Sequence, residues 1–371
     1  MSTGALNLSG EEPAKLSLLG LPAESVIELF ESLGEKPYRA RQVMRWMYGR
    51  GVVDFAAMTD LSAGLRKQLA SIATTDLPRV LECEHSADGT RKWLLDMNAG
   101  QAIETVFIPE PNRGTLCISS QAGCALDCAF CATGHQGFNR NLTAAEILGQ
   151  VVHASCELVD AKITNVVFMG MGEPLANYRN VLPVVKLLVD ELGYGLSRRR
   201  VTISTSGLVP QIDRLAAECN VALAVSLHAP TDELRNELVP INRIHPISEL
   251  LAACWKYAQG QASRQITFEY VLLDGVNDSV AQARQLVKLL RNRPAKVNLI
   301  PFNTFPASDF RCSTPEAIEA FWRTLRDAGI VAAIRRPRGD DIAAACGQLA
   351  GRVRDRQRVR LGDKQIGAGS P

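Results

Sequence analysis

The sequence lacks the features that direct a chain into or across a membrane. Its 371 residues contain no apolar run approaching the length of about 18 residues that a membrane-spanning helix needs. The N-terminus, Met-Ser-Thr-Gly-Ala-Leu-Asn, has no basic segment followed by an apolar core, unlike a secretory signal. We therefore expect a cytoplasmic protein with no membrane partner. In that reducing compartment the ten cysteines should be free thiols or metal ligands, and any disulfide should be transient.

The sequence also lacks a large excess of charge, an internal repeat and a low-complexity tract. The formal net charge is +2, and 46% hydrophobic with 22% charged residues describes an ordinary globular protein. The arginines are nevertheless clustered, at 198–200, at 335–338 and between Arg352 and Arg360. Clustered arginine in a nearly neutral chain favours a local anionic partner such as RNA, and a merely solvated surface is the competing interpretation.

The ends of the chain differ in composition from its centre. Residues 1–15 are small, polar and unpatterned, which predicts a disordered N-terminus, and residues 351–371 predict a basic, flexible tail. Residues 16–90 predict a helical accessory domain, since apolar residues recur with a helical period in 23–33 and 38–48. Arginines beside Trp46 suit this domain for binding an RNA backbone, although a plain packing role is equally compatible.

The remaining residues, 91–350, alternate between strand and helix patterns. Two runs, 91–96 and 102–108, flank a turn and predict a β-hairpin. Short β-branched runs then alternate with helical stretches, at 115–119, 165–170, 201–205, 221–227, 266–272 and 296–302. Such alternation is typical of parallel strands in one curved sheet. We therefore predict an α/β fold, a partial (β/α)6 TIM-type barrel extended by the hairpin, with its chemistry at the C-terminal strand ends.

Three cysteines, Cys124, Cys128 and Cys131, lie in a C-x-x-x-C-x-x-C run after the first predicted barrel strand. This spacing supplies three thiolates and no fourth, so a 4Fe-4S cube bound here keeps one iron without a protein ligand. An open metal position is where a small molecule can bind and react. The spacing resembles that of the radical S-adenosylmethionine (SAM) enzymes, which implies a 4Fe-4S cluster and SAM as cofactors.

Structural zinc is the main alternative for these cysteines, since Cys128-x-x-Cys131 is half of a zinc knuckle. Zinc requires a second close pair of cysteine or histidine ligands. His135 is poorly spaced for that role, and the sequence holds no second C-x-x-C pair. The spacing therefore favours an iron–sulfur cluster over zinc.

Polar residues follow several of the predicted strands at their C-terminal ends. Met-Gly-Met-Gly-Glu-Pro comes directly after the second barrel strand and resembles the GEP motif that meets the methionine amino group of SAM in radical SAM enzymes. Taken singly, each of these residues could equally cap a turn or pack in the core. Together they surround one cavity, as binding of a ribose, a carboxylate and an adenine requires. The candidate SAM-binding residues are Gly172, Glu173, Ser204, Ser226, Leu227, His228 and Asn303.

Two further cysteines stand apart from the cluster motif, Cys117 on the first barrel strand and Cys346 near the C-terminus. With their surroundings, the chain closely resembles the RlmN/Cfr family of radical SAM RNA methyltransferases from about residue 20 to about residue 350. The segments that carry the resemblance are Leu116–Gly134, Gly137–Leu142, Asn165–Tyr178, Val225–Ala229 and Arg338–Leu349.

The resemblance implies a catalytic role for Cys346, for Cys117 and for Glu104. In the family, the cysteine matching Cys346 accepts a methyl group from one SAM, and a radical generated from a second SAM activates that methyl group. The methylene then bonds to carbon 2 of adenine and tethers the RNA. The cysteine matching Cys117 releases the product by forming a disulfide, and the acid matching Glu104 transfers a proton. An exposed acid on a hairpin strand is the competing interpretation of Glu104.

The resemblance also implies the partners. They are an adenosine of 23S rRNA at the peptidyl-transferase centre, an adenosine of tRNA beside the anticodon, and a reductant protein such as flavodoxin. The sequence leaves the oligomeric state open, with a monomer as the default. Two alternatives remain: methylation at adenine carbon 8, as in Cfr, and an iron–sulfur or zinc RNA-binding protein without catalysis.

Overall fold

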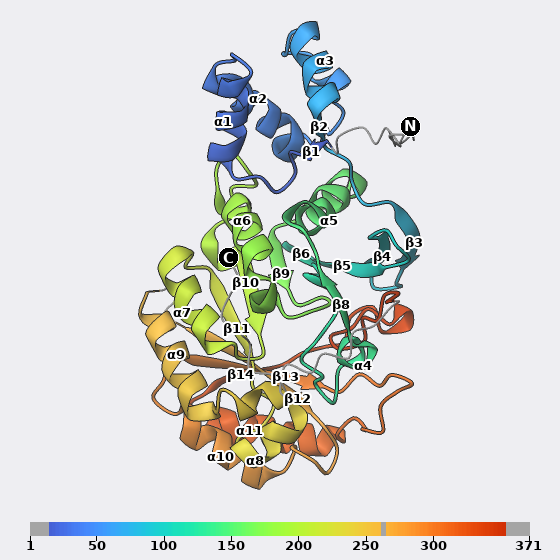
Figure 1. Cartoon of the computed structure of the whole chain (residues 1–371). Helices are drawn as coiled ribbons and strands as arrows, with labels where there is room; N and C mark the ends of the chain where they lie inside the picture. The colour runs from blue at the N-terminus through green and yellow to red at the C-terminus, as the bar shows by residue number, and fades with distance from the viewer. Residues whose placement is uncertain (1–14, 261–264, 354–371) are drawn as a thin grey trace, which may run out of the picture.

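The computed structural model describes residues 15–260 and 265–353 (Figure 1). The predicted disorder of residues 1–14 and flexibility of residues 354–371 lie outside the described residues. Ten strands form the main sheet, in the order β14-β13-β12-β11-β10-β9-β6-β5-β4-β3. Their bounds are β3 (Val80–His85), β4 (Arg91–Asp96), β5 (Ala102–Glu110), β6 (Arg113–Cys117), β9 (Asn165–Phe168), β10 (Val201–Thr205), β11 (Ala222–Ser226), β12 (Ile266–Leu272), β13 (Ala295–Pro301) and β14 (Val331–Ile334).

The sheet divides into a parallel and an antiparallel part. β9 to β14 pair in parallel, and β3 to β5 pair antiparallel. β6 joins the two parts, since it is parallel to β9 and antiparallel to β5. All six predicted barrel strands are present, and the hairpin appears as β4 and β5. The central strands are buried on both faces, which explains their nearly continuous apolar sequences. The predicted partial barrel is therefore confirmed. β14, whose sequence is short and exposed, is an additional parallel strand at its edge.

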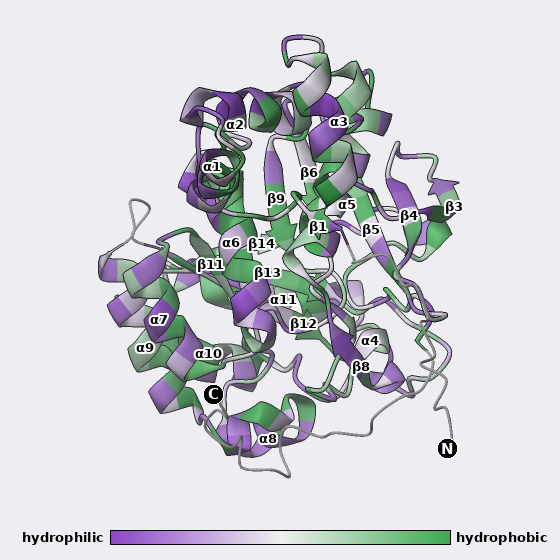
Figure 2. Ribbon diagram, turned by 45° about the horizontal axis from the view of Figure 1, so that its top comes forward, coloured by the Kyte–Doolittle hydropathy of each residue, from purple (hydrophilic) through white to green (hydrophobic). Residues whose placement is uncertain are grey.

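Helices follow the parallel strands, and Figure 1 shows α6, α7, α9, α10 and α11 around the outside of the sheet. In Figure 2 the strands are mainly coloured hydrophobic, and hydrophilic residues gather on the helices. The helices of the barrel are α4 (Ala132–Gln136), α5 (Ala144–Glu157), α6 (Tyr178–Val189), α7 (Val209–Glu218), α8 (Asp232–Leu238), α9 (Ile247–Gln259), α10 (Val280–Leu290) and α11 (Pro315–Asp327). Among the helices of the described residues, none combines the length and apolar character that crossing a membrane requires.

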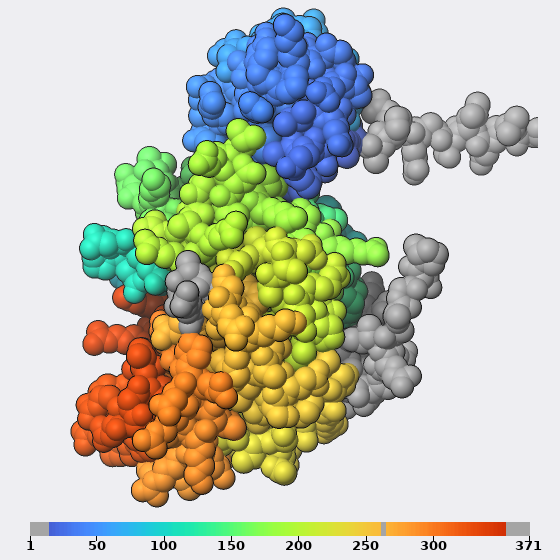
Figure 3. Space-filling model, turned by 90° about the vertical axis from the view of Figure 1, so that its left-hand side faces the viewer, coloured from blue at the N-terminus to red at the C-terminus, as the bar shows by residue number. Residues whose placement is uncertain are grey.

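The N-terminal helices form a separate lobe at one end of the molecule (Figure 3). The lobe contains α1 (Ala23–Ser32), α2 (Pro37–Met44), which continues into a turn of π-helix, and α3 (Ala63–Ile72). Two short strands, β1 (Leu16–Ser17) and β2 (Ala73–Thr74), pair in parallel and bring its two ends together. The apolar stripe of α1 buries Val26 and Phe30, which explains its helical period.

The boundaries of this lobe and of the tail differ in detail from the expected ones. β3 lies within the segment 16–90 that we assigned to the helical domain, and it pairs with β4 as an edge strand of the main sheet. Its short Leu-Glu-Cys-Glu alternation buries neither face, since almost all of its side chains are exposed, so its strand signal was weak. In the expected tail, the backbone of Arg352 pairs with Ala102, and its side chain forms an ion pair with Glu82.

Candidate active site

The three clustered cysteines lie in a loop that leaves the barrel and returns to it. The loop runs from β7 (Gln121–Gly123) through α4 to β8 (Phe138–Asn141), and the two strands pair antiparallel. Gly123 has a φ of +79°, and a Cβ there would lie 1.9 Å from the carbonyl oxygen of Gly137. Only glycine permits this close return of the chain. The glycine at position 123 therefore allows the loop to start and end at the same edge of the barrel.

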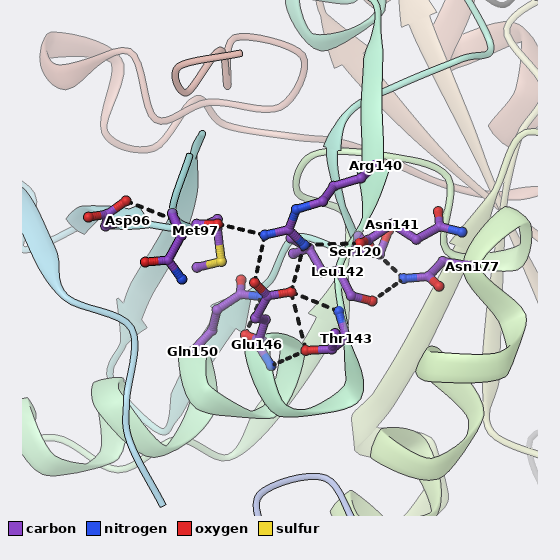
Figure 4. Close-up of polar contacts among 11 residues, drawn as sticks. Asp96, Met97, Ser120, Arg140, Asn141, Leu142, Thr143, Glu146, Gln150 and Asn177 are labelled. Atoms are coloured by element: carbon purple, nitrogen blue, oxygen red, sulfur yellow. Dashed lines mark hydrogen bonds and ion pairs between the residues drawn. The ribbon is translucent and has the colours of Figure 1, made fainter. Parts of the chain in front are cut away.

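Polar contacts anchor both sides of this loop to the barrel, as Figure 4 shows. The Arg140 guanidinium forms two hydrogen bonds with the Glu146 carboxylate, at 2.8 and 2.7 Å, and donates to the Met97 carbonyl in the hairpin turn at 2.6 Å. Glu146 also forms a capping box with Thr143 at the start of α5. On the other side, the Asn177 amide donates to the carbonyl oxygen of Ser120 at 2.8 Å.

The three cysteines line one cavity, which we call the cluster cavity and which also holds Glu173 and His228. Burial raises the pKa of Cys128 to about 12 and raises the pKa of the other two thiols as well. By itself the chain therefore favours neutral thiols, and bound iron would stabilise the thiolate forms.

The geometry of these residues bears on the choice between zinc and iron–sulfur. Within residues 15–260 and 265–353, no three cysteine, histidine or acidic side chains converge closely enough to hold a single metal ion. A tetrahedral zinc site needs four ligands around one point. A cube would take one thiolate on each of three irons and leave the fourth iron open. The donor set fits a cube with three cysteine ligands and one open iron better than it fits zinc.

Glu173 offers a buried carboxylate to the same cavity. The side chain accepts hydrogen bonds from the backbone N–H groups of Leu175 at 3.0 Å and Ser206 at 2.8 Å. Burial raises its pKa to about 7 despite these bonds. The preceding residue, Gly172, has a φ of +93°, and a Cβ there would lie 2.5 Å from the side chain of Gln121. This glycine lets the turn fold tightly enough to aim Glu173 at the cavity, where an ammonium group would find an anionic partner.

Other predicted SAM-binding residues lie at the strand ends, as expected. Ser204, Ser226 and His228 line the cluster cavity. The Nδ1 atom of His228 accepts a hydrogen bond from the Val271 backbone at 3.0 Å, so the neutral ring carries its proton on Nε2. Burial lowers the pKa of His228 to about 3, which keeps the ring neutral. His228 therefore presents a hydrogen-bond donor.

Leu227 and Asn303 occupy different positions from these residues. Leu227 is fully buried, and its backbone N–H donates to the Glu269 carbonyl at 3.0 Å, so it supports the strand end rather than lining the cavity. Asn303 lines a neighbouring cavity, and its side-chain amide donates to the Cys346 carbonyl at 3.1 Å.

Cys346 stands where two cavities meet. It lines the cluster cavity and also a second cavity, which we call the basic cavity. Cys117 lies at the end of β6, in the wall of the basic cavity. The other basic-cavity residues that matter here are Arg113, Lys296, Arg335, Arg336 and Arg338. The fold thus brings together two thiols that are 229 residues apart in the sequence (346 − 117).

The disulfide expected between these two cysteines is not formed. All ten cysteines of the chain are free thiols in the structure. Burial is the main reason that the pKa of the Cys117 thiol lies above its usual range, and the neighbouring Cys346 raises it further. A protonated, buried thiol is a weak nucleophile, so Cys117 would have to lose its proton before it could attack another sulfur atom.

Glu104 lies on β5 and is largely buried rather than exposed. Its carboxylate accepts a hydrogen bond from the Ala350 backbone at 2.8 Å and lies 3.4 Å from the Lys92 ammonium group. Ala350 follows the Cys346 segment, so this acid fixes that segment to the hairpin. Neither cavity has Glu104 in its wall.

Two functional candidates, Glu269 and Arg235, were missed at the sequence level, and Arg335 was expected there only as part of an arginine cluster. Glu269 on β12 is buried, lines the cluster cavity and accepts a hydrogen bond from Asn298 at 2.8 Å. Arg335 lines both cavities beside Cys346. Arg235 is fully buried behind the strand ends of β10 and β11. Side chains alternate between the two faces of a strand, and this alternation was the one sequence signal that could have placed Glu269 on the face toward the cavity.

Comparisons with known proteins agree with this arrangement. Residues 16–75 match the Ribosomal RNA large subunit methyltransferase N-terminal domain, and residues 118–287 match the Radical SAM superfamily. A radical SAM methyltransferase from Sphaerobacter thermophilus has 48% sequence identity to this chain and a TM-score of 0.86. The match covers 90% of this chain and 99% of that one.

More distant solved structures include a domain of pyruvate-formate lyase-activating enzyme from Bacteroides vulgatus and the hydrogenase maturase HydG. The first has 19% identity and a TM-score of 0.37, and covers 46% of this chain and 99% of that one. The second has 13% identity and a TM-score of 0.44, and covers 62% of this chain and 54% of that one. These two similarities are too weak to add to the assignment.

The superfamily implies a 4Fe-4S cluster and SAM, and the N-terminal domain implies an RNA substrate. The similarity to the Sphaerobacter radical SAM methyltransferase extends over nearly the whole chain. The chain therefore belongs to the RlmN/Cfr family of radical SAM methyltransferases.

Proposed function

We propose that this protein methylates carbon 2 of adenosine in 23S rRNA and in tRNA through a methyl group carried on Cys346. The observation that carries the proposal is the position of Cys346, in the walls of both the cluster cavity and the basic cavity. A methyl carrier must meet its donor on one side and the base on the other, and this position suits both contacts.

The cluster cavity supports the donor half of the reaction. Cys124, Cys128 and Cys131 would hold the cluster, with Glu173 facing the amino group of SAM. Ser204, Ser226 and His228 supply hydroxyl and imidazole groups for its polar atoms. When bound, the cluster and SAM supply the radical that removes a hydrogen atom from the methyl group on Cys346. Ordinary displacement from SAM cannot methylate adenine carbon 2, because that carbon is electrophilic.

The basic cavity supports the acceptor half. Arg113, Lys296 and Arg336 line it and carry positive charge toward an RNA phosphate. An adenine that enters must leave its stack, as for other enzymes that act on bases within folded RNA. The exposed run Arg198–Arg200 and the exposed arginines of the N-terminal lobe extend the positive surface available to a large RNA.

The two cysteines then have distinct tasks. After the methylene carbon of Cys346 has bonded to the base, the adduct is a thioether. Cys117 lines the same cavity and forms the S–S bond to Cys346 as the carbon–sulfur bond breaks. Glu104 takes part in proton transfer at the substrate carbon, for which its carboxylate must exchange the Lys92 or Ala350 contact for one with the adduct. A reductant protein such as flavodoxin returns the disulfide to thiols and supplies electrons.

Substitution of the two cysteines tests this division of tasks. We expect Cys346→Ala to cleave SAM but to transfer no methyl group, because the carrier sulfur is lost. We expect Cys117→Ala to accumulate a covalent protein–RNA adduct, because the thioether is not resolved. The reconstituted, oxygen-protected proteins are incubated with methyl-labelled SAM and either 23S rRNA fragments or tRNA. Denaturing gels detect the adduct, and chromatography detects 5′-deoxyadenosine.

Matched controls make these outcomes decisive. Cys219→Ala removes a buried thiol that lines neither cavity and should behave as the unsubstituted protein. Mass spectrometry of the nucleosides separates 2-methyladenosine from 8-methyladenosine and so distinguishes this proposal from Cfr-like methylation. Methylated RNA from Cys346→Ala would refute the carrier role, and a lack of any SAM cleavage by the intact protein would favour a non-catalytic RNA-binding protein.

A further inference from the structure

The most unusual buried group near the cluster cavity is the guanidinium of Arg235 on α8. The side chain is 0% exposed. It donates hydrogen bonds to the backbone carbonyl oxygens of Ser206 at 2.6 Å, Ser226 at 2.9 Å and Leu227 at 3.1 Å, and to the side-chain oxygen of Asn242 at 2.8 Å. One arginine thus holds together the ends of β10 and β11.

All of these acceptors are neutral, and a buried charge normally has an ionic partner. Among the ion pairs found within residues 15–260 and 265–353, none involves Arg235. The carboxylate of Asp232 on the same helix is engaged elsewhere, with Asn242 at 2.9 Å and the Ile247 backbone at 2.8 Å. The positive charge is therefore hydrogen-bonded but not neutralised by a bonded carboxylate.

The same helix leads directly to the proposed cluster ligands. The Leu238 carbonyl at the end of α8 accepts a hydrogen bond at 3.1 Å from the N–H of Ala129, which follows Cys128. Ser206, held by Arg235, donates its N–H to the Glu173 carboxylate. Ser206 therefore links Arg235 to Glu173 in the cluster cavity, and the end of the same helix contacts the loop between Cys128 and Cys131.

We propose that Arg235 is a positioning residue whose buried positive charge stabilises the reduced, more negative form of the cluster. This inference rests on the proposed binding of a cluster by Cys124, Cys128 and Cys131. Each electron that enters the cluster adds one negative charge to a site that already contains thiolates and the Glu173 carboxylate. Net charge and hydrogen bonding set the potential of iron–sulfur clusters, so a fixed buried cation favours reduction.

The test compares two substitutions at this position. Arg235→Gln removes the charge and keeps hydrogen-bond donors, whereas Arg235→Lys keeps the charge and loses the planar fork. The full-length proteins are reconstituted with iron and sulfide, and the midpoint potential is measured by EPR-monitored redox titration. For Arg235→Gln we expect the ratio of reduced to oxidised cluster at a fixed potential to fall about tenfold, which is about 59 mV for a one-electron couple. For Arg235→Lys we expect less than about a threefold change.

Controls separate this inference from the proposed function and from misfolding. Arg214→Gln removes an arginine on α7 whose side chain is 57% exposed, and it should leave the potential unchanged. Iron content and the visible spectrum report whether each variant holds a cluster. If Arg235→Gln does not hold a cluster, Arg235→Lys tests the proposal instead. A tenfold fall in its ratio of reduced to oxidised cluster, despite the retained charge, would overturn the proposal. An unchanged potential in cluster-loaded Arg235→Gln would also overturn it. An intact protein that binds no cluster would instead overturn the proposed function.

Discussion

At the scale of single residues, Glu173 shows how burial prepares a side chain for a cationic ligand. Two backbone N–H groups hold its carboxylate, yet removal from water raises its pKa to about 7. An ammonium group from a ligand would restore the electrostatic stabilisation that water no longer supplies. The residue is therefore most stable when neutral or when paired with a bound cation.

This pKa shift predicts a pH dependence of stability in the ligand-free, cluster-free protein. Between the unfolded-state value of about 4.5 and the folded-state value of about 7, the folded protein binds the extra proton. The free energy of unfolding should therefore fall as pH rises through this window, by about 3 kcal/mol at most from this group. Glu173→Gln should remove that part of the slope. Urea unfolding at several pH values measures it, and equal slopes in both proteins would contradict the prediction.

At the scale of secondary-structure elements, short polar networks decide where the cluster loop meets the barrel. Arg140 on β8 joins the hairpin turn to the start of α5, and Glu146 caps that helix at the same time. Because both residues serve two elements, their contacts fix the orientation of the loop as well as its position. The apolar residues of α5 then pack its inner face against the barrel.

We predict that Arg140→Ala lowers the free energy of unfolding by about 1–3 kcal/mol, because it removes two charge-assisted hydrogen bonds to Glu146 and two bonds to carbonyl oxygens. The matched control is Arg323→Ala on α11, whose pair with Glu319 has side chains 63% and 41% exposed. Exposed pairs of this kind contribute less than about 1 kcal/mol. Urea denaturation compares the two, and a loss no larger at Arg140 than at Arg323 would count against this network.

At the scale of the whole molecule, the two cavities share Cys346 and Arg335, while the N-terminal lobe stands at one end of the barrel (Figure 3). The proposed donor and RNA-binding functions therefore belong to adjacent cavities that share these two residues. Arg335 lines both cavities, whereas Arg113, Arg336 and Arg338 line the basic cavity alone, and the run Arg198–Arg200 is exposed. Salt should therefore affect the two functions differently.

We predict that raising the salt concentration weakens RNA binding but leaves SAM cleavage in place. Phosphate contacts release counterions, so the logarithm of the affinity should fall linearly with the logarithm of salt concentration. Arg336→Ala should lower the magnitude of that slope by about one, and Arg291→Ala, beyond the end of α10, should not change it. Fluorescence anisotropy with a labelled tRNA gives the slopes. An affinity that does not respond to salt would exclude an electrostatic RNA site.

The sequence by itself determined the parallel strands, the hairpin and the cysteine loop, because these depend on local patterns. Continuous β-branched runs, separated by stretches with helical periodicity, specified the strand positions. Motifs at the ends of these strands predicted polar groups at the mouth of the barrel. The resemblance carried by the cysteine and GEP segments specified the family. The exposed strands β3 and β14 were not predicted, since neither buries a regular apolar face.

Only the tertiary structure decided how distant residues share a site. It placed Cys117 and Cys346 in one cavity wall, moved Asn303 away from the cluster cavity, and tied Glu104 to the segment after Cys346. It also revealed Arg235, whose sequence context is that of an ordinary polar helix. These relations depend on contacts between separate elements. Hydrophobic periodicity describes which face an element buries, but it carries no information about which side chains meet there.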